Sequence, residues 1–129
     1  MVKMMFDIPI YNIHVLLIQG ESNKDADVIK KEFKKFGLNQ TIIDEVTDYL
    51  SRDFIDGADT FFQLETMRIC MFAFPITTPK IKRRVYDHEK RHVEDRVLKH
   101  LGIDDMEAAS YLAGYLGERF YEFEKLQDK

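Results

Sequence analysis

The sequence predicts an α+β domain that combines a small β-sheet with segregated helices. Three observations predict this class. Short apolar segments of strand length lie at residues 10–20 and between residues 60 and 74. Two helical patterns separate these segments, and two longer helical patterns follow them. The expected order is therefore strand, two helices, two strands and two helices, in one domain that spans residues 1–129.

The composition is that of a globular protein, with 45% hydrophobic and 33% charged residues. Asp7, Pro9, Asn12 and His14 interrupt the apolar opening, so we expect neither a signal peptide nor a membrane span. Cys70 is the only cysteine, which excludes an internal disulfide and predicts a core position and a cytoplasmic location. The net charge of −4 predicts no general attraction to nucleic acid, and no pattern fixes the oligomeric state.

The first half of the chain is predicted to hold a strand and two helices. The segment IYNIHVLLIQG, residues 10–20, is rich in Ile, Val and Leu and ends at Gly20, as expected of a buried strand. A helix capped by Ser22 then ends at Gly37, and a second begins at Asn39 and ends near Arg52. The apolar positions with helical spacing are Ala26, Ile29, Phe33 and Phe36 in the first helix, and Ile42, Ile43, Val46, Tyr49 and Leu50 in the second.

The second half is predicted to hold two strands and two helices. DFIDGAD, residues 53–59, predicts a turn before two extended segments at 60–64 and 67–74, for which one long bent strand is the alternative. Thr78 and Pro79 mark the start of a helix that runs to Gly102. Asp104 or Asp105 can cap the last helix, which is rich in strong helix formers.

The first of these two helices carries the motif His88-Glu89-Lys90-Arg91-His92. Side chains four residues apart lie on one helix face, so two imidazoles can converge on one metal ion, and neutral nitrogen ligands suit zinc. Glu89 lies about 100° around the helix, where it can accept a proton from a zinc-bound water that then attacks a peptide carbonyl. The motif predicts a zinc-dependent peptidase with Glu89 as general base. A charged, solvated helix with two unrelated histidines is the alternative, which Lys90 and Arg91 fit.

A catalytic zinc needs a third protein ligand. The acidic candidates on or before the last helix are Asp104, Asp105, Glu107 and Glu118. If the last two helices form an antiparallel hairpin around Gly102, the motif lies level with Tyr115, about 12 Å beyond Glu107 and a few ångströms short of Glu118. Simple hairpin geometry therefore favours Glu118, and Glu107 requires a steep crossing or an early end of the motif helix.

The motif, the following HLGIDD and the segment Glu107-Ala108-Ala109-Ser110-Tyr111-Leu112 resemble the small gluzincin-type metallopeptidases of phages and mobile elements. The resemblance covers the C-terminal third of the chain. It implies a zincin-like domain in which a motif-bearing helix precedes a glutamate-bearing helix, with Zn²⁺ as cofactor and a peptide or protein as substrate. It also implies Glu107 as third ligand, which we take in preference to Glu118, with Ser110 in a small-residue position and Tyr111 in an aromatic one.

The same resemblance implies that MRICMFAF, residues 67–74, is an edge strand beside the zinc, along which a substrate can lie. The segment has no polar face, so a core strand is the alternative. Tyr111, our second candidate catalytic residue, and Tyr115 lie one turn apart and can donate to an oxyanion, although such tyrosines are more often packing residues. His14, inside an apolar strand, predicts a hydrogen-bonded core histidine rather than a ligand.

Two other classes of function fit parts of the sequence. A protein with the zincin fold but no activity, acting by binding a partner, is one alternative. A basic helix face that contacts nucleic acid is the other, although the overall acidity and the acidic residues on the same helix disfavour it. The basic residues concerned are Lys80, Lys82, Arg83, Arg84, Lys90 and Arg91.

Overall fold

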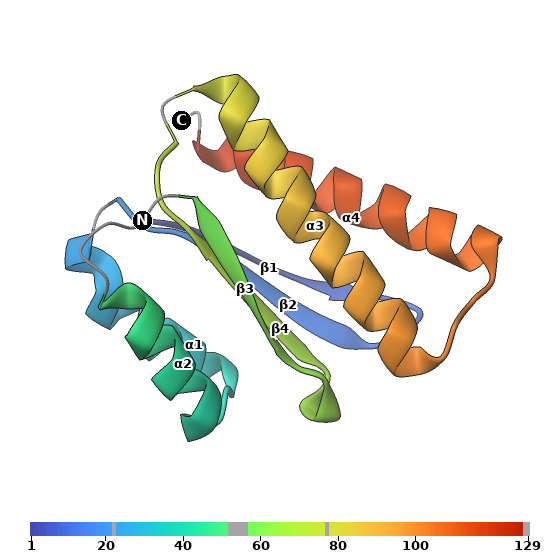
Figure 1. The fold of residues 1–129 in the computed structure, drawn as a ribbon, viewed down its shortest axis with the longest axis horizontal. Coiled ribbons are helices and arrows are strands. Elements are labelled where there is room, and N and C mark those ends of the chain that lie inside the picture. The colour runs from blue at the N-terminus through green and yellow to red at the C-terminus, as the bar shows by residue number, and fades with distance from the viewer. Residues whose placement is uncertain (22, 52–56, 77, 128–129) are drawn as a thin grey trace.

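A four-stranded β-sheet carries a pair of helices on each face in the computed structural model, which describes residues 1–21, 23–51, 57–76 and 78–127 (Figure 1). Helices α1 and α2 cover one face, and the longer helices α3 and α4 cover the other. The predicted α+β class is confirmed.

Four strands, four α-helices and two short 3-10 helices make up the described part of the chain. The strands are β1 (Val2–Ile8), β2 (Ile13–Gln19), β3 (Ala58–Gln63) and β4 (Arg68–Ala73). The helices are α1 (Ala26–Phe36), α2 (Gln40–Leu50), α3 (Pro79–Leu101) and α4 (Met106–Gln127), with η1 (Asn23–Asp25) before α1 and η2 (Leu64–Thr66) between β3 and β4.

Two antiparallel hairpins joined by a parallel seam form the sheet, in the order β1-β2-β4-β3. β1 pairs with β2, and β3 pairs with β4, both antiparallel. The interior strands β2 and β4 run parallel to each other, with His14 opposite Arg68 and Gln19 opposite Ala73. β1 and β3 are therefore the two edges of the sheet.

Each face of the sheet has its own apolar core, because successive side chains of a strand point to opposite faces. Val15, Leu17 and Met71 face α3 and α4, where they pack with Val93 and Leu116. On the opposite face the strands pack against α1 and α2 through a second cluster. Its main members are Leu16, Ile18, Cys70, Phe72, Phe33 and Val46. Cys70 is fully buried, which confirms its predicted core position.

Several predicted helix ends are confirmed. The Asn39 side chain accepts a hydrogen bond from the backbone N–H of Ile42 at 3.1 Å and caps α2. Gly37 and Gly102 end α1 and α3 with positive φ angles of 108° and 67°. Pro79 is the first residue of α3, after Thr78 in the capping position. The predicted cap Ser22 and residues 53–56 of the predicted turn lie outside the described residues.

Two strand predictions need correction. The predicted order lacked β1, whose side chains alternate between half-buried and exposed; the apolar but exposed Met5 hides this alternation in the sequence. The one-strand alternative for residues 60–74 is wrong, because the chain reverses through η2. Met67 adopts the left-handed conformation there, with φ 59°, at a turn in which the sequence offers no glycine.

No helix within the described ranges is both long enough and apolar enough to cross a membrane.

Candidate metal centre

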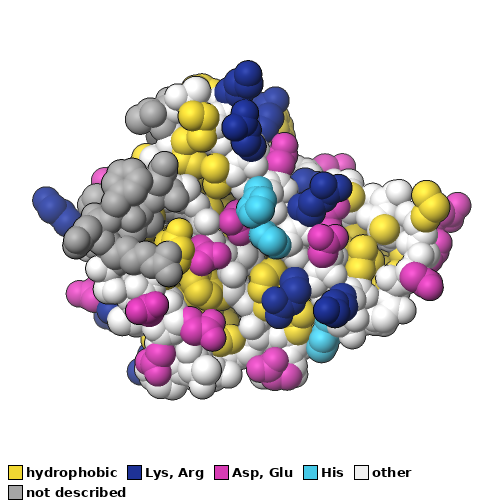
Figure 2. Space-filling view, in the orientation of Figure 1, with side chains coloured by type: hydrophobic (Ala, Val, Ile, Leu, Met, Phe, Trp, Pro, Cys, Tyr) yellow, Lys and Arg dark blue, Asp and Glu magenta, His cyan; other side chains and the backbone are white. Residues whose placement is uncertain are grey.

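The motif lies on an unbroken stretch of α3, and its two histidines meet. His88 and His92 are exposed, and their Nε2 atoms lie 2.9 Å apart. The two ring planes are nearly perpendicular, with their centroids 4.4 Å apart. On the α3 face of the molecule, adjoining histidine side chains form an exposed patch among acidic and basic side chains (Figure 2).

The separation of the two nitrogen atoms is close to what a metal ion needs. Two nitrogen ligands at 2.0–2.1 Å from a tetrahedral zinc ion lie about 3.3 Å apart. The imidazoles of His88 and His92 would have to separate by only a few tenths of an ångström. These two residues therefore fit as zinc ligands, and without metal one ring can donate its N–H to the other.

Glu89 faces the sheet rather than solvent. The side chain is only 5% exposed, and its Oε2 accepts a hydrogen bond of 2.5 Å from the hydroxyl of Thr60 on edge strand β3. Its other oxygen, Oε1, has no hydrogen-bond partner in the described part of the chain. Oε1 is thus the atom of Glu89 available to a water molecule or a proton.

The surroundings of Glu89 favour its protonated form. Burial raises the pKa of the carboxyl above its ordinary value, and the nearby charge of Asp59 adds to this effect. The hydrogen bond from Thr60 and the neighbouring imidazoles of His92 and His88 act in the opposite direction. A carboxyl with a raised pKa beside two candidate metal ligands has the character expected of a proton-transfer group.

The structure does not bring the predicted third ligand to the histidines. Within the described ranges, no group of three His, Cys, Asp or Glu side chains is arranged to hold a metal ion. Glu107 is exposed and lies one turn before Tyr111, whose ring stacks on Tyr115 beside Phe6 of β1. The histidine pair instead adjoins Glu89, which is bonded to β3 at the opposite edge of the sheet.

Glu118, the ligand that hairpin geometry favoured, also points away. It is two residues, or about 200° around the helix, from the buried Leu116, so it lies on nearly the opposite side of α4. Its carboxylate is 73% exposed and lies 3.7 Å from Arg119. Hairpin geometry sets the position of each glutamate along the helix axis but not its direction around the axis.

Tyr111 lies with Tyr115 and not with the histidines. The two rings are stacked, with centroids 6.4 Å apart. The hydroxyl of Tyr115 donates to the backbone oxygen of Asp7, 2.5 Å away, whereas the hydroxyl of Tyr111 has no partner among the described residues. The structure therefore shows a packing pair beside β1, the alternative considered for these tyrosines.

The strand beside the motif is β3, which corrects the role implied for residues 67–74. β4 is paired on both sides and almost wholly buried, so it is a core strand. β3 is the edge strand next to α3, where Thr60 bonds Glu89 and the Phe62 ring lies 4.4 Å from the guanidinium of Arg96. Thr60 is the site residue that sequence reasoning missed, because only the register of β3 brings it to a helix 29 residues away.

The basic residues of α3 do not form a continuous positive surface. Lys90 is paired with Glu94 at 3.1 Å, and Asp87 lies beside Arg84 and Arg91 in the hollow next to His88. Basic and acidic side chains alternate over this face (Figure 2). The arrangement does not favour a nucleic-acid contact.

No family model matches the chain. Comparisons with curated proteins and with solved structures also return no match.

Proposed function

We propose that this protein is a zincin-like domain of the metallopeptidase type that binds zinc through His88 and His92. The observation that carries the proposal is the convergence of the two Nε2 atoms, 2.9 Å apart, from successive turns of one helix. Zinc bound there supplies a Lewis acid and a water molecule of lowered pKa. Glu89, whose pKa burial raises, is the neighbouring group able to take up a proton at Oε1.

Two ligands fit and the third does not, so we assign no catalytic step to the metal. Hydrolysis of a peptide or protein substrate is the activity that the resemblance adds to the proposal, with the cytoplasm as the location. A zinc-binding protein without peptidase activity is the second candidate. The hydrogen bond from Thr60 favours this second candidate, because it holds the Glu89 carboxylate against β3.

Zinc titration by calorimetry tests the metal site. We expect the wild-type chain to bind one zinc ion, and His88→Ala and His92→Ala each to weaken binding by about tenfold or more. His100→Ala, which removes another exposed histidine of α3, is the matched control and should bind as the wild type does. Equal binding by all four proteins would show that the two histidines hold no metal.

Glu107→Ala and Glu118→Ala complete the set. Both should leave zinc affinity unchanged, because neither side chain lies with the histidine pair. A loss with Glu107→Ala as large as that with His88→Ala would show that α4 rearranges to complete a three-ligand site.

Cleavage of an unstructured protein such as casein separates the two candidates. If the protein is a peptidase, the zinc-loaded wild type cleaves casein, and Glu89→Gln keeps zinc affinity but loses cleavage. Zinc binding without cleavage by the wild type would leave the second candidate, and cleavage retained by Glu89→Gln would remove Glu89 from the reaction.

A further inference from the structure

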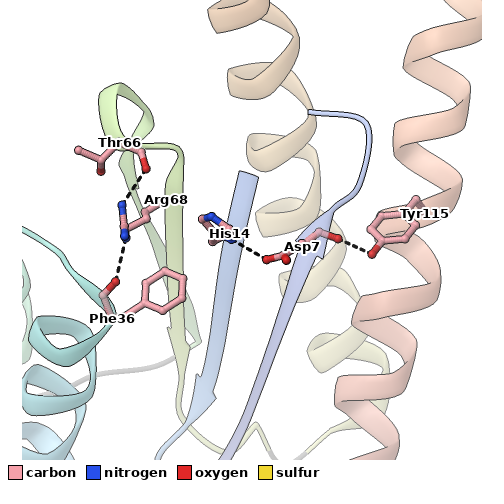
Figure 3. Close-up of polar contacts among 6 residues, drawn as sticks. All are labelled: Asp7, His14, Phe36, Thr66, Arg68 and Tyr115. Atoms are coloured by element: carbon pink, nitrogen blue, oxygen red, sulfur yellow. Dashed lines mark hydrogen bonds and ion pairs between the residues drawn. The ribbon is translucent and has the colours of Figure 1, made fainter. Parts of the chain in front are cut away.

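A row of charged side chains crosses the sheet on the face that α1 and α2 partly cover, away from the motif of α3. Asp7 of β1 is the register partner of His14 of β2, which is in turn the partner of Arg68 of β4. His14 and Arg68 share the face of Leu16 and Cys70, which lie two residues further along the same strands, and Asp7 shares it as the register partner of His14. Figure 3 shows the row, with Tyr115 of α4 at one end and Phe36 of α1 at the other.

Hydrogen bonds hold all three side chains of the row and leave nitrogen atoms of His14 and Arg68 without a partner among the described residues. His14 Nδ1 lies 2.6 Å from Asp7 Oδ1 and donates to that carboxylate. Arg68 Nε donates to the backbone oxygen of Phe36, and Nη1 donates to that of Thr66, both at 2.9 Å. His14 Nε2 and Arg68 Nη2 have no partner in the part of the chain that the structure describes.

These groups line an open hollow beyond the end of α1. Its volume is about 400 Å³, which is within the range of small-molecule sites. The walls combine the charged row with apolar side chains: Met5, Phe6, Asp7, His14, Val15, Phe36 and Arg68. Met5 is 66% exposed and presents apolar surface to the hollow.

We propose that this hollow binds a small organic acid through its carboxylate. The carboxylate lies between Arg68 Nη2 and His14 Nε2, and the apolar part of the ligand covers Met5 and Phe36. Guanidinium and carboxylate groups form strong, charge-assisted hydrogen bonds. The Asp7 carboxylate accepts the Nδ1–H of His14, which leaves Nε2 as the ring nitrogen that faces the ligand carboxylate.

The charges of the row balance one bound carboxylate. In the proposed complex both ring nitrogens of His14 carry protons, so that Arg68 and His14 together supply two positive charges against the one negative charge of Asp7. These three are the charged side chains among the residues that line the hollow. A structural role at the end of α1 explains the two bonds of Arg68 to carbonyl oxygens, but it does not explain why the open nitrogen atoms of Arg68 and His14 face the same hollow.

Titration of the ¹⁵N-labelled protein with phenylacetate, followed by NMR, tests this site without zinc. We expect saturable shifts confined to the residues around the hollow. Phenylacetamide, which has the same shape but no charge, and inorganic phosphate, which has charge but no apolar part, should each bind about tenfold more weakly. Equal binding of phenylacetamide, equal binding of phosphate, or shifts that do not saturate would each overturn the proposal.

Variants assign the contacts. Arg68→Met should abolish phenylacetate binding, but it also removes two hydrogen bonds to backbone oxygens. Met5→Gln changes an exposed side chain and should weaken the binding of phenylacetate severalfold. It should leave the binding of acetate, which has no large apolar part, unaffected. Met106→Gln, at an exposed methionine outside the hollow, is the matched control and should change neither. Unchanged phenylacetate binding by Met5→Gln would contradict the proposed position of the apolar group.

Discussion

His88 and His92 lie one turn apart on a single helix, whereas His14 acquires Asp7 and Arg68 only through the pairing of three strands. The geometry of the first pair follows from the helix repeat alone, so the spacing in the sequence predicts it. The geometry of the second cluster follows from strand register, which no local pattern specifies. A motif in the sequence therefore predicts which side chains meet on one helix. It does not predict which side chains the pairing of strands brings together.

The largest change in stability that would sharpen this comparison is expected at Gly37, next to the Arg68 side chain. A Cβ atom at Gly37 would lie 2.7 Å from Arg68 Nε, and φ is 108° there. We expect Gly37→Ala to lower the free energy of unfolding by about 2–3 kcal/mol, through backbone strain and the clash with Arg68. Urea unfolding measures this change. The same variant should lose phenylacetate binding, because the guanidinium must move.

Gly102→Ala is the matched control for Gly37→Ala. Gly102 also has a positive φ, 67°, but a Cβ atom added there would meet nothing within 4 Å among the described residues. We expect it to cost about 1–2 kcal/mol of backbone strain and to bind phenylacetate normally. Equal losses of stability in the two variants would show that the Arg68 side chain moves aside freely. The contrast between the two glycine positions would then weaken.

A smaller effect is expected at the tyrosines beside the row. Tyr115→Phe removes the hydrogen bond to the backbone oxygen of Asp7 and should lower the free energy of unfolding by about 1 kcal/mol. Tyr111→Phe removes a hydroxyl without a partner among the described residues and should stay within about 0.5 kcal/mol of the wild type. If Tyr111→Phe instead abolished cleavage of casein, α4 would have to bring this hydroxyl to the histidines.

The smallest effect concerns the pH dependence of stability at Glu89. Protonated Glu89 stabilises the fold, because its pKa is higher in the folded protein than in the unfolded chain. This contribution is fully present below the pKa that Glu89 has in the unfolded chain. That stability is lost as the pH rises through the raised value. Gln cannot ionise, so Glu89→Gln should gain stability relative to the wild type as the pH rises from the ordinary pKa of a glutamate through the raised pKa of Glu89.

Urea unfolding of both proteins across this pH range measures the difference. Glu118→Gln, at an exposed carboxylate of α4, is the control and should follow the wild type at every pH. A difference between Glu89→Gln and the wild type that stays constant or shrinks with rising pH would contradict the raised pKa of Glu89.

The sequence predicted the parts of this fold that short-range chemistry determines. Asn39 caps α2 through its own side chain, and Gly37 and Gly102 end helices because they readily adopt positive φ angles. β1 was missed because Met5 breaks the alternation of polar and apolar residues, although it lies at an exposed position of the strand. The sequence contains no signal for that exposure.

The candidate metal site was also predictable from the sequence only in part. The meeting of His88 and His92 follows from their spacing, whereas the partner of Glu89, Thr60, depends on which edge of the sheet α3 covers. The position of Glu107 depends on the rotation of α4 about its own axis, which is set by packing of the whole apolar face of that helix. Sequence spacing contains neither of these quantities.

The parallel seam between β2 and β4 has a consequence for folding. Each outer hairpin can close by contacts between residues near one another in the chain, but the seam joins strands separated by both α1 and α2. Closing such a long loop costs conformational entropy before its contacts can compensate, so we expect the seam to form late and to limit the folding rate. Until then the chain holds two separate hairpins, neither of which is large enough to persist alone in water.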